Sequence, residues 1–213
     1  MKPQEIEARS MEIIEKEMRE RGINFPPAEE LAVMKRCIHT SADFDYGENL
    51  VFSPRAVSKA MEALKAGVTI VTDTNMAAAG INKSAAAKLG VRVKCFMADE
   101  DVAEEAKKRQ ITRAAVSMEK AAALGEPVII ACGNAPTALI QIDEMIKNGK
   151  MCREQLRLVI GVPVGFVNVV EAKELILKTD IPHIVAKGRK GGSNIAAAIC
   201  NALLYQCVTR EDG

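Results

Sequence analysis

The sequence predicts a single α/β domain over residues 1–213, with a mostly parallel sheet, helices on both faces and an N-terminal helical segment. Three observations predict this fold class. From about residue 50 onward, short apolar runs alternate with segments of helical periodicity, which is the pattern of repeated strand and helix units. The apolar runs are continuous, as expected for strands that are covered on both faces. The helical segments between them carry cap residues in front and glycine behind.

Two helices are expected before the sheet begins. Gln4 to Arg21 is amphipathic and is followed by a glycine, and a Phe-Pro-Pro turn separates it from a second helix over about Ala28 to Thr40. The second helix places Arg36 and His39 three residues apart, so their side chains are neighbours on the flank of its apolar stripe. The polar stretch that follows, SADFDYGEN, is expected to form a loop.

Five apolar runs are expected to form the strands. They are VTIVTD at 68 to 73, VRVKCF at 91 to 96, PVIIACG at 127 to 133, LVIGVPVG at 158 to 165 and HIVAKG at 183 to 188. In an open parallel sheet, ligands bind outside the carboxyl ends of the strands. Four loops at that edge read TDTNM, GNAPT, GVPVGF and KGRKGGS. Their Gly, Pro, Asn and small hydroxyl residues predict a broad cleft lined by backbone.

The GNAPT loop offers backbone groups that could hold an anion. Asn134 is expected to cap the next helix and Pro136 to lie in its first turn, which would leave backbone N–H groups for a carboxylate or a phosphate. Simple helix capping explains the same residues. None of these loops carries a G-x-G-x-x-G or a Walker A motif, so dinucleotide binding lacks its usual sequence support.

Cations provide a second kind of anion-binding group. The KGRKGGS loop sets three of them among glycines that permit close backbone approach, namely Lys187, Arg189 and Lys190. Ser193 could start the last helix, and solvated loop charge is the alternative explanation. Thr112 and Arg113 begin the helical segment ITRAAVSMEKAAALG, where a cation near the positive end of the helix dipole is unfavourable unless it faces an anion. An exposed arginine with a small electrostatic cost is the alternative there.

The two histidines are the candidate acid/base groups. His39 lies on a helix flank beside a cation and before an acidic loop, and imidazole can donate and accept protons near neutral pH. A structural role is the alternative, because a lone histidine on a helix is more often structural. His183 opens an apolar run and is expected to pack or to hydrogen-bond in the interior. Two histidines cannot assemble a multi-histidine metal site.

Composition disfavours several classes of protein. Lys and Arg number 29 against 28 Asp and Glu, without a long run of one sign, which argues against binding to a nucleic-acid backbone. No apolar run approaches the roughly 18 residues that cross a membrane, and the N-terminus does not resemble a signal peptide, so a cytoplasmic protein without a membrane partner is expected. The six cysteines contain no C-x-x-C pair and are expected to be mostly buried thiols.

Taken together, these segments resemble the precorrin-8X methylmutase family, including its cobalt-precorrin-8 members. The matching stretches are Ala8-Arg9-Ser10, Arg36-Cys37-Ile38-His39, LVFSP from Leu50, TDTNM from Thr72, Thr112-Arg113, GNAPTAL from Gly133, GVPVGFV from Gly161 and GRKGGS from Gly188. They occur in the family's order and cover nearly the whole chain. The chain departs from the family pattern in the pair before Ser10, although the serine itself is present. It also departs in the two apolar residues between Arg36 and His39, a change that should not alter the chemistry.

The resemblance implies a homodimeric isomerase of corrin (cobalamin) biosynthesis that binds its ring near the dimer interface. It would move a methyl group from C-11 to C-12 of precorrin-8X or cobalt-precorrin-8, giving hydrogenobyrinate or its cobalt form. No cofactor, metal ion or methyl donor is implied, because the migrating group stays on the substrate. The family's acid/base histidine matches His39, and its substrate-contacting serine and arginine match Ser10 and Arg36. Further candidate substrate contacts are Thr112, Arg113, Asn134, Arg189 and Ser193.

Two other functions remain open from the sequence. A tetrapyrrole carrier would keep the ring-binding fold and bind the ring without converting it. A nucleotide-dependent oxidoreductase or transferase would rest on fold analogy alone, and the missing glycine fingerprints count against it.

Overall fold

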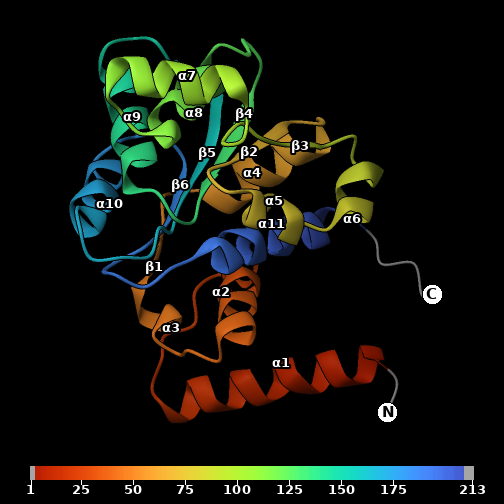
Figure 1. Ribbon diagram of the computed structural model, residues 1–213. Coiled ribbons are helices and arrows are strands. Elements are labelled where there is room, and N and C mark those ends of the chain that lie inside the picture. Colours follow the sequence, from red (N-terminus) through yellow and green to blue (C-terminus); the bar gives the residue numbers. More distant parts are fainter. Residues whose placement is uncertain (1–2, 209–213) are drawn as a thin grey trace.

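The computed structural model describes residues 3–208 and confirms the predicted fold class (Figure 1). Within this part of the chain, six strands form one sheet in the order β1-β6-β5-β4-β2-β3. The strands are β1 (Leu50–Phe52), β2 (Thr69–Thr72), β3 (Arg92–Cys95), β4 (Val128–Cys132), β5 (Leu156–Gly161) and β6 (His183–Ala186). Strands β2 to β6 run parallel, and β1 pairs antiparallel with β6 at one edge. The carboxyl ends of the five parallel strands therefore lie at one edge of the sheet.

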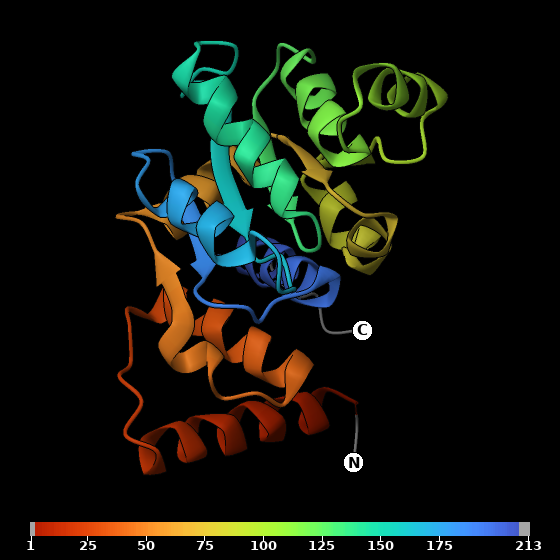
Figure 2. The same cartoon turned by 60° about the vertical axis from the view of Figure 1, so that its left-hand side comes forward.

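Helices cover both faces of this sheet, as the sequence predicts (Figure 2). In the described residues they are α1 (Pro3–Glu20), α2 (Ala28–Ser41), α3 (Tyr46–Asn49), α4 (Ala56–Lys65), α5 (Asn75–Gly80), α6 (Lys83–Lys88), α7 (Glu100–Arg109), α8 (Arg113–Ala122), α9 (Pro136–Lys147), α10 (Val169–Leu177) and α11 (Ser193–Cys207). As predicted, α1 ends just before a glycine with positive φ, Gly22, and α2 spans the helix that carries Arg36 and His39.

Alternate residues of each central strand enter two separate apolar cores. In β4, Ile129 and Ala131 pack into one core together with buried residues of α2, α4 and α11. Ile130 and Cys132 pack into the other core, which α8, α9 and α10 complete. Because both faces of the strand are buried, its sequence is continuously apolar.

Three elements differ from the predicted pattern. Strand β1 is too short, at three residues, to show a strand period, and its pairing with β6 holds it in place. The stretch expected to be a loop contains the one-turn helix α3, which follows an Asp43 carboxylate that accepts the N–H of Asp45 at 3.0 Å. The predicted fourth strand also ends earlier than expected, so Val162 to Gly165 belong to the loop after β5.

Helix α1 lies on the outside of the molecule and packs against α2 (Figures 1 and 2). Glu7 accepts a hydrogen bond from Arg36 at 2.6 Å, and Glu15 accepts one from Lys35 at 2.9 Å. Ile6 and Ile13 remain about half exposed, at 52% and 49%. Among the described helices, α1 included, none combines the length and apolar character that a membrane span requires.

Candidate active site at the carboxyl edge of the sheet

The four predicted loops follow β2, β4, β5 and β6 and contact one another. The hydroxyl oxygens of Thr74 and Ser193 lie 2.8 Å apart, and Gly192 donates its N–H to the carbonyl of Val162 at 2.9 Å. A Cβ atom on Gly133 would lie 2.7 Å from the Cα of Ser193, so only glycine lets these two loops pack so closely. We call residues 72–76, 133–137, 161–166 and 187–193 the loop rim. It is a continuous surface at the edge where ligands bind in such sheets.

A buried carboxylate occupies the backbone donors of the GNAPT loop. Asp73 accepts hydrogen bonds from the N–H groups of Gly133 and Asn134 at 2.8 Å each, and from that of Ala135 at 2.7 Å. Burial raises the pKa of Asp73, while the three donors act in the opposite direction. These N–H groups therefore serve a carboxylate of the protein itself, and the prediction that they are free for a ligand is wrong.

The predicted capping role of Asn134 is also wrong. Ala135 is the N-cap of α9 and makes no side-chain capping bond, and Pro136 follows it in the first turn as predicted. Asn134 is exposed, and its backbone N–H donates to the carboxylate of Asp73. What remains available at this position is the amide side chain.

The KGRKGGS loop presents one cation outward beside an aromatic ring. Arg189 is exposed, and its guanidinium carbon lies 5.4 Å from the centre of the Phe166 ring. The Phe166 side chain is itself 82% exposed, and Val164 next to it is exposed as well. Ser193 begins α11 as predicted, with Gly192 as the N-cap. This part of the loop rim therefore combines apolar surface with a cation.

Lys190 has a different role from the one expected for the loop cations. Its Nζ lies 2.6 Å from Asp43 Oδ2 and 2.5 Å from Asp45 Oδ2. The hydrogen bond from Lys190 lowers the pKa of Asp43, and the two carboxylates raise the pKa of Lys190. Lys190 is therefore paired within the protein, and it ties the segment after α2 to the loop rim.

His39 lies in the last turn of α2 and is exposed. Asp43 follows it by four residues, so the pairing of Lys190 with Asp43 brings this end of α2 toward the loop rim. His183, in contrast, is buried, and its Nδ1 lies 2.9 Å from the carbonyl of Ile181. This contact confirms the interior role predicted for His183.

The packing of α1 on α2 places Arg36 against the helix that carries Ser10. The Arg36 side chain is 19% exposed, donates to Glu7 at 2.6 Å and lies over the Tyr205 ring at 5.2 Å. The Ser10 hydroxyl, three residues beyond Glu7, donates to the carbonyl of Ile6 at 2.8 Å. Both side chains make intramolecular contacts in this structure.

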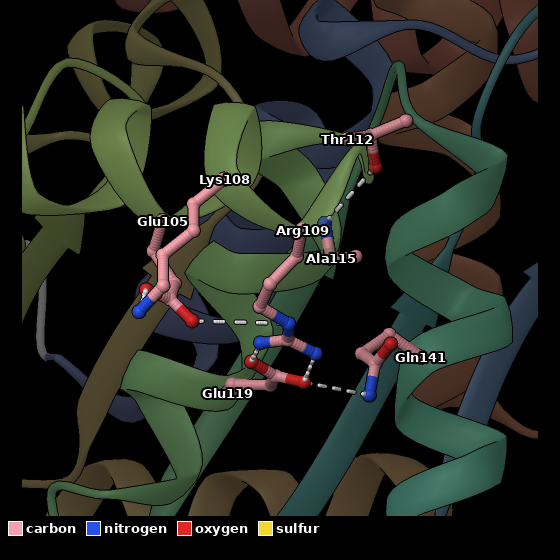
Figure 3. Close-up of polar contacts among 7 residues, drawn as sticks. All are labelled: Glu105, Lys108, Arg109, Thr112, Ala115, Glu119 and Gln141. Atoms are coloured by element: carbon pink, nitrogen blue, oxygen red, sulfur yellow. Dashed lines mark hydrogen bonds and ion pairs between the residues drawn. The ribbon is translucent and has the colours of Figure 1, made fainter.

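Thr112 caps α8 (Figure 3) and also contacts Thr137 of the loop rim. Its Oγ1 accepts the N–H of Ala115 at 3.2 Å and donates to the hydroxyl of Thr137 at 2.8 Å. Arg113 is exposed at the next position and lines a surface hollow with Ala106 and Gln110. The structure thus joins Thr112 to the GNAPT loop and places Arg113 toward α7.

A buried lysine was missed by the sequence reasoning. Lys173 of α10 donates from Nζ to the carbonyls of Gly188 and Lys190, at 2.8 Å each, in the KGRKGGS loop. Burial lowers its pKa to about 8. The available signal was its position in VVEAKELIL, beside Ala172 and three residues before Ile176 on the helix face that enters the core.

A further cavity lies at the opposite edge of the sheet. It has a volume of about 720 Å³ and is lined by residues at the amino ends of the strands, including Thr69 and Leu156. Most of its ionic side chains already have partners within the protein. Arg92 pairs with Glu126 at 2.8 Å, and Arg153 pairs with Asp180. The sequence-predicted site residues lie elsewhere, so we place the candidate site at the loop rim.

The cysteines are free thiols, and half of them are buried. Cys37, Cys132 and Cys200 lie in the interior, whereas Cys95 and Cys207 are half-buried and Cys152 is exposed. Burial raises the pKa of Cys37 to about 12, so this thiol stays protonated at neutral pH. Within the described residues, no group of three His, Cys, Asp or Glu side chains could hold a metal ion.

Known proteins are similar to this chain over most of its length. A family model described as precorrin-8X methylmutase matches residues 5–206. The chain is 43% identical over 208 residues to a cobalt-precorrin-8 methylmutase of Leptospira interrogans, covering 93% of this chain and 91% of that protein. It is 38% identical over 177 residues to a precorrin-8X methylmutase of Pseudomonas aeruginosa, covering 82% of each. A crystal structure of precorrin-8X methylmutase from Thermus thermophilus is similar with a TM-score of 0.85 and 35% identity, covering 95% of this chain and 96% of that one.

Proposed function

The chain belongs to the precorrin-8X methylmutase family, and we propose that it moves a methyl group from C-11 to C-12 of precorrin-8X or cobalt-precorrin-8. The product, hydrogenobyrinate or cobyrinate, contains the same atoms as the substrate. The C-11 to methyl bond breaks as the C-12 to methyl bond forms, so no methyl donor, nucleotide or redox partner is consumed. The enzyme must bind the ring, hold one tautomer and stabilise the shift.

The observation that carries this proposal is that the loop rim exposes both apolar side chains and a cation. Phe166 and Met76, which are 82% and 73% exposed, offer apolar surface to a flat ring. Arg189 lies beside Phe166 and can pair with a carboxylate arm at the edge of the ring. A large polycarboxylate macrocycle needs both kinds of contact, whereas a nucleotide would need a phosphate-binding loop that this chain lacks.

We assign His39 the role of proton donor and acceptor. Protonation of the conjugated ring would ease the methyl migration, and removal of a proton afterwards would give the product tautomer. The exposure of His39 and the attachment of the following segment to the loop rim through Lys190 and Asp43 support this role. A single imidazole can perform both steps because it exchanges protons near neutral pH.

The remaining candidate residues are proposed as substrate contacts. Arg36 would exchange Glu7 for a substrate carboxylate, with the Ser10 hydroxyl close by on α1. Thr112, Asn134 and Ser193 would add neutral polar groups along the loop rim. Arg113 would meet a more distant carboxylate arm from its exposed position at the start of α8.

We also propose that the enzyme works as a cytoplasmic homodimer. The half-exposed Ile6 and Ile13 of α1, together with the exposed Phe25 that follows this helix, support a second copy packing on this side. Ser10 lies on the same helix, so the dimer would form near one end of the proposed site.

The test of the function follows the visible spectrum of precorrin-8X or cobalt-precorrin-8 after addition of enzyme. Wild type should convert the ring to an isomer of unchanged mass, and His39→Asn should bind the ring but lose conversion by about a hundredfold or more. Thr40→Ala, a change at the exposed neighbouring position, serves as the control and should convert normally.

Each alternative has its own outcome in this experiment. Spectral shifts with wild type but no isomerised product would identify a carrier. Conversion by both wild type and His39→Asn would leave the enzyme in place and remove His39 as its acid. Binding of NAD, NADP or ATP in calorimetry would favour the nucleotide-dependent enzyme.

A further inference from the structure

Lys173 is a lysine buried on the core face of α10. It is 1% exposed, and its neighbours Ala172 and Ile176 belong to the apolar core. Burying a lysine is costly unless its donors are satisfied, and a methionine of similar length would fill the same space without that cost. The partners of Lys173 therefore explain why a lysine stands at this position.

Those partners fix the backbone on both sides of Arg189. The Lys173 Nζ donates to the carbonyls of Gly188 and Lys190, both at 2.8 Å. The carbonyl of Arg189 itself accepts the N–H of Gly165 at 3.2 Å. Three consecutive carbonyls are thus held by groups of α10 and of the loop after β5, while the Arg189 side chain extends outward over Phe166.

We infer that Lys173 is a positioning residue that fixes the KGRKGGS loop and so presents Arg189 to a carboxylate of the substrate. This inference rests on the proposed function, in which Arg189 binds the substrate. Lys173 cannot touch the ring, because it is buried beneath the loop that it holds. Its contribution is to keep a long, exposed cation from sampling orientations that do not meet the carboxylate.

The kinetic test compares Lys173→Met with Lys178→Met, which removes an exposed lysine at the end of the same helix. Lys173→Met should raise the KM for precorrin-8X about tenfold and leave kcat within about twofold, because the lost interaction positions a binding group. Lys178→Met should behave as wild type. If Lys173→Met does not fold, Lys173→Gln is measured in its place, with the same direction expected.

A double variant separates positioning from general stability. If Lys173 acts through Arg189, Lys173→Met combined with Arg189→Ala should have the KM of Arg189→Ala alone, within about twofold. The inference is overturned if the KM increases of the two single variants multiply in the double variant. It is also overturned if Lys173→Met leaves the KM unchanged.

Amide hydrogen exchange provides a measurement that needs no substrate. The amides of Gly165 and Gly192 are bonded across the loop rim and should exchange about tenfold faster or more in Lys173→Met, but not in Lys178→Met. Unchanged exchange would show that Lys173 does not hold the loop. If wild type converts no substrate, the proposed function fails, and the exchange rates still decide whether Lys173 orders the loop.

Discussion

At the scale of single residues, the buried carboxylate of Asp73 holds two loops of the candidate site together. It links the loop after β2 to the loop after β4 by accepting three backbone N–H groups. These groups would otherwise be unpaired donors at the start of α9, where their dipoles favour an anion. The protein therefore uses this anion-binding position for its own architecture, which leaves side chains such as Arg189 as the proposed partners of substrate carboxylates.

Replacing Asp73 with asparagine should destabilise the fold. The amide NH₂ group would face a backbone N–H that now donates to a carboxylate oxygen, leaving a buried donor unpaired. The free energy of unfolding should fall by about 2–4 kcal/mol, since a hydrogen bond to a charged group contributes about 1.5–3 kcal/mol. Urea denaturation followed by circular dichroism measures this change.

The control for this prediction is Asp101→Asn, whose carboxylate is exposed and forms an ion pair with Lys120. It should unfold close to the wild-type urea concentration. Equal stability of Asp73→Asn and wild type would show that the three hydrogen bonds do not stabilise this loop.

At the scale of elements, α8 is held by a cap at its start and by a cluster farther along that joins three helices (Figure 3). Arg109 of α7 makes two hydrogen bonds to Glu119 of α8, at 2.5 and 2.9 Å, and Gln141 of α9 donates to the same carboxylate at 3.3 Å. These contacts orient α8 against its neighbours. Thr112 then connects its first turn to the GNAPT loop.

Removing the Thr112 hydroxyl should weaken both the cap and that connection. Thr112→Ala should lower the free energy of unfolding by about 1–2 kcal/mol, because it loses a capping bond and the bond to Thr137. Thr112→Ser keeps the hydroxyl and should remain within about 0.5 kcal/mol of wild type. Thermal and urea unfolding of the two variants measure these changes. If both variants lose the same free energy of unfolding, the stabilisation comes from the Thr112 methyl group and not from its hydroxyl.

At the scale of the whole molecule, α1 carries apolar side chains that the single chain does not bury. Ile6 and Ile13 are about half exposed on a helix that packs against the rest of the protein mainly through α2. A second copy on this side would remove them from water and would lie close to Ser10 and Arg36.

The proposed dimer predicts a solution mass of twice 23.0 kDa for wild type in light scattering after size exclusion. Ile13→Asp should shift the mass to that of one chain, since it would place a charge in an apolar contact. Ile13→Leu keeps the apolar surface and should remain dimeric. A wild-type mass of 23.0 kDa at micromolar concentration would refute the dimer proposal.

Much of the fold could be predicted because its signals are local. The short runs rich in apolar residues identified β2 to β6, although β3 includes Arg92 and Lys94, and the amphipathic patterns identified α1 and α2. Strand β1 was missed because three residues carry no period, and only its pairing with β6 makes it a strand. The strand order could not be predicted from the sequence either, because it depends on crossover connections that no local pattern records.

By itself, the sequence determined the fold class, the loops that meet at the carboxyl edge, the position of His39 on its helix and the resemblance to the methylmutase family. Only the tertiary structure decided which polar groups in these loops are free. Asp73 meets an amide 60 positions away, and Lys190 meets a carboxylate 147 positions away. Helix and strand patterns arise from interactions between near neighbours in the chain, whereas the partner of a charged group depends on which distant segments the fold brings together.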